Sequence, residues 1–264
     1  MPYADPPVPP KDIAPAPGPT HRLWVAIGPC FAVAIVAGSR ALFVVGLAVA
    51  IVVGTALTVL RFVDPPTSTL MLSQRLAGIP VRQQWTPLAR ISPHMIRAAI
   101  AAEDTQFCSH RGIDIRELEA ALEKAERTGD DVVRGASTIP MQVAKNLFLW
   151  PGRSYARKGL ELALAPSLDL LWPKARTLEI YLNIVEWGPG VFGAEAAAQY
   201  HFRKPAARLT AGESALLAAA LPNPIERSAG RPNEALRRIA RIVEARVRSP
   251  AMRFGCVLPG EAKP

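Results

Sequence analysis

The chain has 264 residues and a formal net charge of +9, so it is long enough for one sizeable core with an appendage. Residues 63–264 carry 27 basic and 20 acidic side chains, and this net +7 favours an acidic partner such as nucleic acid, anionic lipid or a phosphorylated substrate. The three cysteines match no zinc spacing or disulfide framework, and the sequence has no glycine-rich phosphate loop.

The first segment, residues 1–22, is rich in proline and is expected to be a disordered tail. Residues 23–61 form an apolar region interrupted by one charge, Arg40. The uncharged stretch at 41–60 has about the ~20 residues that a helix needs to cross the hydrocarbon core of a membrane. This region is far longer than the apolar part of a signal peptide and has no clear cleavage site, so we predict a membrane anchor.

Two topologies fit this region. A single span at 41–60 would leave Arg22 and Arg40 in the cytoplasm and the rest of the chain outside. A hairpin of two spans would return the rest of the chain to the cytoplasm, with Arg40 in its turn. The charge bias does not choose between them.

Beyond the membrane region, residues 62–92 are predicted to be a partly extended connector punctuated by prolines. The pattern of residues 93–248 is almost entirely helical, and residues 249–264 are expected to be a tail, so the fold class is mainly α. Ser92 and Pro93 predict the start of a helix that runs to about Phe107.

Three further helices have clear capping signals. Asp114 is expected to cap a helix that Gly129 stops, Thr210 and Glu213 predict a capping box, and Asn233 is expected to cap a basic amphipathic helix. Cys30 lies in the apolar region, so only Cys108 and Cys256 could pair, and the sequence does not require that they do.

The stretch "AAEDTQFCSHRGID" places Glu103 and Asp104 side by side where an apolar helix ends. Taken alone, this favours a solvated helix end. In "GASTIPMQVAKNLFL", Ser137 is the expected helix cap, which puts Pro140 at the third helical position, where its missing N–H costs nothing.

The side chains of Gln142, Lys145 and Asn146 then share one stripe of that helix, which is equally typical of a solvent face. Arg157 and Glu161 have the i,i+4 spacing of an ion pair, which is ordinarily a surface feature of small value.

The next helical segments are marked by prolines. Pro166 is expected to kink one helix and Pro173 to start the next, in which Tyr181 belongs to the predicted core and Asn183 is polar near it.

Five motifs then occur in an order that resembles glycosyltransferase family 51, which includes the transglycosylase domain of class A penicillin-binding proteins. They are "EDTQFCSHRGID", "GASTIPMQVAKN", "RKGLE", "LEIYLN" and "GVFGAEAAAQYHF". The likeness covers about residues 61–248. It implies a lysozyme-like α-helical domain that polymerises lipid II into glycan strands by inverting transfer to the acceptor 4-hydroxyl, with release of undecaprenyl diphosphate.

The resemblance implies a role for each matching residue. Glu103 matches the catalytic carboxylate, which would act as general base, and Glu161 matches a second carboxylate that would orient the cations and the donor. The implied substrate-binding residues are Asp104, Phe107, Ser137, Gln142, Lys145, Asn146, Arg157 and Lys158. The implied structural or supporting residues are His110, Gly112, Tyr181 and Asn183.

The same resemblance implies one span in the bacterial cytoplasmic membrane, with the enzyme domain on the periplasmic side. Its implied partners are lipid II, the growing glycan strand, the membrane and other cell-wall synthesis proteins, without nucleic acid. No metal site or required cofactor is expected, although a divalent cation could assist at the substrate pyrophosphate.

Three positions depart from the family pattern: Gln106, Met141 in place of a glutamine, and Pro166. Met141 and the unusual prolines support one alternative, a catalytically weakened membrane-anchored partner of the cell-wall machinery. The lysozyme-like fold leaves another, an enzyme that cleaves glycan.

Overall fold

A computed structural model describes residues 19–128, 135–152 and 154–261, with side chains described from Ser39 onwards. The chain divides into two compact units with the boundary between Ala56 and Leu57. The predictions for residues 1–18 and for Gly129 lie outside the described residues.

The first unit contains helix α1 (Pro19–Leu60) up to Ala56. This helix is 42 residues long and continues through Arg40, so the turn of a two-span hairpin does not form there. Its part from Ser39 to Leu60 has 22 residues with a mean hydropathy of 2.6, which is long and apolar enough to cross a membrane. Residues 19–22, predicted as part of a disordered tail, belong to this helix.

The second unit is mainly helical, which confirms the predicted fold class. Its helices are α2 (Thr69–Leu76), α3 (Pro93–Glu103), α4 (Ile115–Thr128), α5 (Ile139–Phe148), α6 (Tyr155–Leu171), α7 (Lys174–Ile184), α8 (Ala194–Phe202), α9 (Ala211–Ala220) and α10 (Glu234–Val247). Short 3₁₀ turns lie at Leu88–Arg90, Ala206–Arg208 and Pro259–Glu261.

A small sheet supports the helices from one side. Its strands are β1 (Arg82–Gln83), β2 (Glu186–Gly188) and β3 (Val191–Phe192), in the order β1-β3-β2. β1 pairs with β3 in parallel and β2 pairs with β3 antiparallel, with an irregular register between Glu186 and Gly188. The sheet thus joins the connector to the segment that follows α7.

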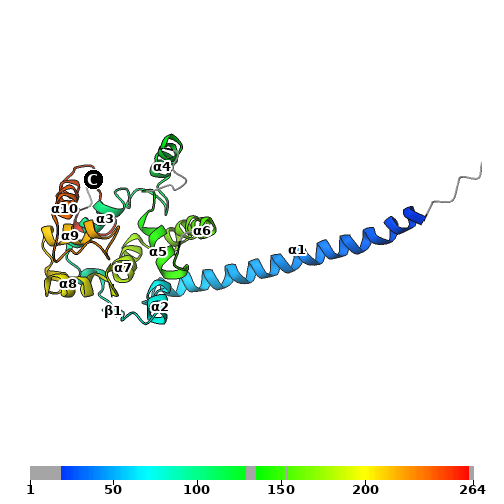
Figure 1. Cartoon of the computed structure of the whole chain (residues 1–264), viewed down its shortest axis with the longest axis horizontal. Coiled ribbons are helices and arrows are strands. Elements are labelled where there is room, and N and C mark those ends of the chain that lie inside the picture. Colours follow the sequence, from blue (N-terminus) through cyan, green and yellow to red (C-terminus); the bar gives the residue numbers. More distant parts are fainter. Residues whose placement is uncertain (1–18, 129–134, 153, 262–264) are drawn as a thin grey trace, which may run out of the picture. The chain divides into compact units, whose positions relative to one another are not determined.

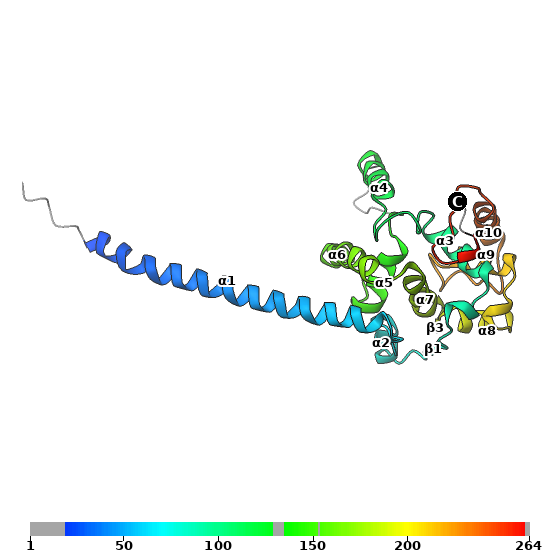
Figure 2. The same cartoon turned by 180° about the vertical axis from the view of Figure 1, so that it is seen from behind.

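The helices of the second unit gather in two groups. α3, α9 and α10 pack together at one end, and α5 packs with α6 and α7 toward the other end (Figures 1 and 2). The largest fully buried side chains include Trp187, Tyr181, Phe107, Phe192 and Met95. The two groups therefore enclose one apolar core, and α3 ends where the groups meet.

Local capping signals fix most helix starts as predicted. Ser92 accepts from His94 N at 3.3 Å, Asp114 accepts from Arg116 N at 3.1 Å and Glu117 N at 3.2 Å. The capping box at Thr210 and the cap at Asn233 also form.

Several local predictions are wrong, and tertiary contacts explain them. α3 ends at Glu103, four residues before the predicted end, because Asp104 leaves helical geometry at φ −160° and ψ 79°. The connector also contains a helix that the sequence analysis did not name, α2, which Ser68 caps and in which Met71 is completely buried.

The start of α5 also differs from the prediction, whereas α6 continues through its proline. The cap of α5 is Thr138 rather than Ser137, which puts Pro140 at the second helical position. Pro166 lies inside α6 and does not end it.

The last turn of α1 belongs to the second unit and is held there by polar contacts. The indole of Trp172 donates to the carbonyl of Leu57 at 2.7 Å, and the Arg176 guanidinium donates to the carbonyl of Leu60 at 3.1 and 3.0 Å. Arg61 donates to the carbonyl of Leu171 at 2.7 Å. The bonds to Leu60 and Leu171 satisfy carbonyls that the end of a helix leaves without partners, whereas the carbonyl of Leu57 also accepts from the N–H of Arg61 at 3.1 Å.

The segment after α10 is part of the folded domain as far as residue 261. Phe254 and Val257 are buried, and Cys256 forms a disulfide with Cys108, a pairing that the sequence left open. The bond joins positions 148 residues apart, between this segment and the loop that follows Glu103.

Candidate active site

The candidate site forms where the end of α3 meets α5, α6 and α7. Glu103 is the last residue of α3 and is partly exposed. Gln142 of α5 donates from Nε2 to Glu103 Oε2 at 2.8 Å, and Tyr181 of α7 donates its hydroxyl to Gln142 Oε1 at 3.5 Å. The tyrosine hydroxyl thereby holds the amide with its NH₂ group toward the carboxylate.

Burial governs the protonation of this group. Loss of water around Glu103 raises the pKa of its carboxyl above the usual value, and the charge of Asp104 adds to the rise. The hydrogen bond from Gln142 and the charge of Lys145 lower this pKa, but less than burial raises it. A carboxylate with a raised pKa is the usual form of a general base or acid near neutral pH.

The pKa of Tyr181 is also displaced. Complete burial, together with the charges of Glu103 and Asp104, raises the pKa of the Tyr181 hydroxyl well above its ordinary value. The hydroxyl therefore stays protonated and remains the donor to Gln142.

Asp104 organises the loop that follows Glu103. Both of its carboxylate oxygens lie 2.9 Å from His110 Nε2, and Oδ2 accepts from the backbone N–H of Ile139 at 2.9 Å. That N–H is at the first position of α5, where a helix leaves donors without partners and favours negative charge. Asp104 is 6 % exposed, so it acts as an anchor and offers little surface to a ligand.

Two further residues fix this loop. Gly112 has φ +84°, and a β-carbon there would lie 2.5 Å from the carbonyl oxygen of Ala165 in α6. Its own carbonyl accepts from the Thr138 hydroxyl at 2.6 Å. Only glycine allows this approach, so Gly112 sets the distance between the loop and α6.

A cluster of cations faces Glu103 across α5. Arg157 pairs with Glu161, and Lys158 donates to Glu161 Oε2 at 3.1 Å and to the Ser137 hydroxyl at 2.9 Å. Glu161 is 3 % exposed and Arg157 9 % exposed, so this pair is buried and is not the surface feature that its spacing alone would favour.

Lys145 lies between the two carboxylates. Burial lowers the pKa of its ammonium group, and the cations Arg157 and Lys158 lower it further, while Glu161 and Glu103 raise it. Among the described residues, none lies within hydrogen-bonding distance of this ammonium group. Lys145 is therefore a partly buried cation whose donors can turn toward a bound anion.

The structure separates the predicted site residues into two sets. Glu103, Gln142, Lys145, Ser137, Lys158 and Glu161 gather around the space beside α5, with Arg157 behind Glu161. Phe107, Asn146 and Asn183 lie in the core. The side chain of Asn183 instead binds the backbone of Thr86, accepting from its N–H at 2.8 Å and donating to its carbonyl at 2.9 Å.

Sequence reasoning missed two supporting residues. Thr138, next to the predicted cap, both caps α5 and binds Gly112. Lys174 donates to the carbonyl of His110 at 2.7 Å and lies 4.8 Å from the centre of the Phe107 ring. The sequence places the cap of α5 at Ser137, one residue before Thr138. No local sequence signal marks Lys174.

In the described part of the chain, no three histidine, cysteine, aspartate or glutamate side chains gather in a way that could hold a metal ion. The charges of this candidate site, which is called the cleft below, nearly balance. The carboxylates Glu103, Asp104 and Glu161 lie among the cations Lys145, Arg157 and Lys158. Such an arrangement can take a proton at Glu103 while cations hold a negatively charged group nearby.

The desolvated carboxylate of Glu103 predicts that the stability of the folded chain depends on pH. Because its pKa is raised in the folded chain, its stabilising contribution is present below the unfolded pKa and is lost as the pH rises through the folded pKa. Relative to Glu103→Gln, the parent chain should therefore become less stable from pH 4 toward pH 8, measured by thermal unfolding in detergent. Glu119→Gln, an exposed change on α4, is the control. A parent chain that gains stability over Glu103→Gln as the pH rises would contradict the burial.

The chain is similar to known proteins over most of its length. The family model for transglycosylase matches residues 72–247. The chain is 50 % identical over 193 residues to a biosynthetic peptidoglycan transglycosylase of Agrobacterium fabrum, covering 73 % of this chain and 84 % of the relative. It is 51 % identical over 201 residues to the protein of that name from Nitrobacter winogradskyi, covering 76 % and 88 %. For the Nitrobacter hamburgensis protein the identity is 49 % over 217 residues, covering 82 % and 94 %.

Proposed function

The chain belongs to the transglycosylase family and is a peptidoglycan transglycosylase, and from this premise we propose that it polymerises lipid II. In the proposed reaction the 4-hydroxyl of an incoming lipid II attacks the anomeric carbon of the growing strand. The bond from that carbon to undecaprenyl diphosphate breaks, and the anomeric configuration inverts. The observation that carries this proposal is the buried carboxylate of Glu103 facing the cations beside α5.

Glu103 is the proposed general base. Its raised pKa makes the carboxylate a better proton acceptor near neutral pH than an ordinary glutamate. Gln142 holds one oxygen, Oε2, which leaves Oε1 to take the proton of the acceptor hydroxyl. A single displacement needs no covalent intermediate on Glu161, which is already engaged by Arg157 and Lys158.

The cations hold the leaving group in this proposal. Lys145 has no direct partner among the described side chains, and Lys158 is partly exposed while bound to Glu161 and Ser137. Both can donate to diphosphate oxygens as negative charge develops on them. The reaction needs no cofactor, and a divalent cation, if one binds, would be held mainly by the diphosphate, because Glu161 is already paired.

Exposed apolar side chains on the second unit support contact with the membrane that carries such a substrate. Leu76 is 81 % exposed at the end of α2, and Tyr155 and Leu170 of α6 are 83 % and 80 % exposed. Phe62 is 76 % exposed just after α1. Apolar patches of this kind mark interaction surfaces, and a lipid-linked substrate would enter the cleft from the bilayer.

The departures from the family pattern do not favour an inactive partner protein. Met141 is 1 % exposed and fills the core, and Pro166 leaves α6 unbroken. The carboxylates and cations of the cleft are all present.

The first test removes the proposed base. Glu103→Gln should lower the rate of glycan polymerisation from lipid II by about 10²–10⁴-fold, because the amide cannot accept the hydroxyl proton. Glu119→Gln should keep the parental rate. Near-parental turnover by Glu103→Gln would overturn the mechanism. Inactivity of the parent chain on lipid II would favour the partner-protein alternative, and degradation of preformed glycan would favour a cleaving enzyme.

A second test removes a cation and keeps its length. Lys145→Met should reduce use of the lipid-linked donor by about 1.5–3 kcal/mol of transition-state stabilisation, the typical value of one charged hydrogen bond. The measurement is kcat/KM for lipid II in detergent. Lys124→Met, an exposed change on α4, is the matched control. If Lys145→Met and the control behave alike, Lys145 does not hold the diphosphate.

We also infer that α1 spans the cytoplasmic membrane once, with the enzyme domain outside. A continuous α1 and the Cys108–Cys256 disulfide support this, because disulfides persist in oxidising compartments. In cells carrying a Cys30→Ser variant, both remaining cysteines should resist alkylation until a reductant is added. Two freely reactive thiols in untreated cells would place the domain in the cytoplasm.

A further inference from the structure

Most of the positive charge of the second unit lies away from the active site. Residues 227–253 contain eight arginines and two glutamates, a net +6, whereas residues 63–264 together carry +7. The cleft contributes almost none of this excess, since its carboxylates and cations balance. The acidic partner that the composition predicts is therefore not accounted for by a substrate diphosphate.

Much of the excess charge lies along α10. Arg237 and Arg241 are four residues apart on one stripe of the helix, with Arg238 beside them, and the C-cap residue Arg248 follows on the same stripe beyond Glu244. All four are exposed, while Leu236, Ala240 and Val243 face the core. We call these four residues the arginine row.

Little neutralises the arginine row from within the chain. Among the described residues, Arg237, Arg238 and Arg241 have no acidic partner, and Arg248 approaches only Glu244, at 3.8 Å. Like charges four residues apart on a helix repel and lower its stability. The row therefore keeps a strong positive potential that attracts an external anion.

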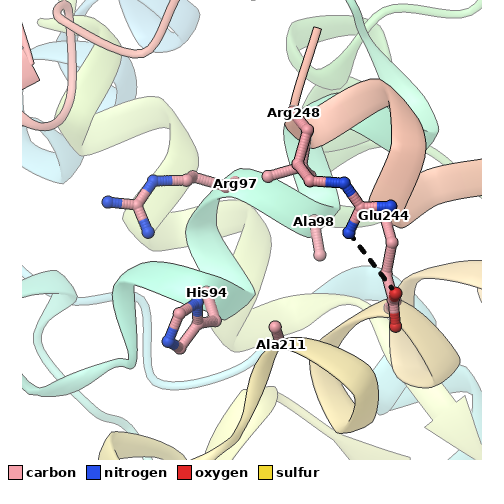
Figure 3. Close-up of a pocket in the computed structure, with 8 residues that line it drawn as sticks. His94, Arg97, Ala98, Ala211, Glu244 and Arg248 are labelled. Atoms are coloured by element: carbon pink, nitrogen blue, oxygen red, sulfur yellow. Dashed lines mark ion pairs between the residues drawn. The ribbon is translucent and has the colours of Figure 1, made fainter.

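A pocket opens beside the end of the arginine row. Its volume is about 360 Å³, and α3, α9 and α10 enclose it. Figure 3 shows His94 and Arg97 of α3 on one side and Glu244 and Arg248 of α10 on the other, with Ala98 and Ala211 between them. The pocket has a floor of small apolar side chains and a rim on which Arg97 and Arg248 lie with the carboxylate of Glu244, so it can take a short peptide group whose carboxylate reaches the arginines.

This surface is distinct from the cleft and from the exposed apolar patch. α10 lies at the opposite end of the second unit from α2 and α6, which carry that patch (Figures 1 and 2). His94 and Glu103 are nine residues apart on α3, which places them on opposite faces of that helix. A ligand on the arginine row therefore does not occupy the catalytic space.

We propose that the arginine row and its pocket bind finished peptidoglycan through the carboxylates of its peptides. The identification of the ligand as peptidoglycan rests on the proposed function. The inference that the ligand is an anion rests on the charge of the arginine row. Protein–protein interfaces are usually built around buried aromatic and apolar side chains, and the arginine row contains no aromatic side chain. A protein partner is therefore not favoured. A row of arginines matches a long, hydrated polyanion with repeated carboxylates.

The experiment measures sedimentation of the full chain, in neutral detergent, with purified insoluble peptidoglycan. The parent should sediment at low salt and be released as salt rises, because exposed charge pairs are screened. The triple variant Arg237→Gln, Arg241→Gln, Arg248→Gln should need roughly tenfold more peptidoglycan for half-binding, since each exposed pair contributes little by itself. The matched control Arg82→Gln, Arg116→Gln, Arg208→Gln removes the same charge from exposed positions elsewhere and should bind like the parent.

Two changes to the binding assay identify the ligand: one alters the peptidoglycan and the other alters the lipid that surrounds the chain. Peptidoglycan whose peptide carboxylates have been converted to amides should no longer retain the parent chain. The parent should also bind native peptidoglycan equally well from vesicles with and without phosphatidylglycerol. Binding lost only in the anionic vesicles would assign the row to lipid headgroups and overturn the proposal.

The remaining outcomes are also decisive. Equal binding by the triple variant and the parent, or undiminished binding to the amidated polymer, would overturn the assignment. The triple variant should polymerise lipid II at the parental initial rate, because the row is outside the cleft. If the parent does not polymerise lipid II yet binds peptidoglycan through the row, the proposed reaction fails and this surface stands.

Discussion

The carboxylate of Asp104 is the contact on which the site depends. It follows directly after the last residue of α3, and it binds both the ring of His110 and the first N–H of α5. The same few atoms therefore end one helix, shape the next loop and begin another helix 35 residues later in the chain. Because Glu103 precedes Asp104 and Gln142 follows Ile139 by less than one turn, this contact brings the carboxylate and its amide partner together.

Burial displaces the pKa values of two charged groups in the site. Glu103 and Lys145 are both displaced toward their neutral forms by loss of water. Arg157 and Glu161 form a buried ion pair beside them. The site thus combines groups that can exchange protons with a paired cation and anion. A reaction that moves one proton and releases one anion needs both kinds.

The sequence predicts the parts of the fold that are encoded locally. Ser92, Asp114, Thr210 and Asn233 mark helix starts because each side chain binds an N–H only two or three residues away. The motifs likewise select residues that do gather beside α5. The end of α3 could not be predicted in this way, because the partner of Asp104 is distant in sequence.

The motifs also do not predict which of their side chains are buried. Asn146 shares a stripe of α5 with Gln142 and Lys145, and the spacing of these residues is the same whether the stripe faces water or the core. In the structure Gln142 and Lys145 are partly exposed, whereas Asn146 is buried. Arg157 and Glu161 illustrate the reverse case, in which a spacing typical of surfaces lies in the interior. Only the packing of α5 against α6 and α7 decides these cases.

The disulfide also imposes an order in time. Cys256 follows Cys108 by 148 residues and lies after α10, so the bond cannot close until all the helices between the two cysteines have been synthesised. Until then, the loop that carries Asp104 and His110 lacks its covalent tie to the C-terminal segment. Completion of the site is thereby linked to synthesis of the segment after α10, so that a chain terminated before Cys256 would have the carboxylate of Glu103 without its full support.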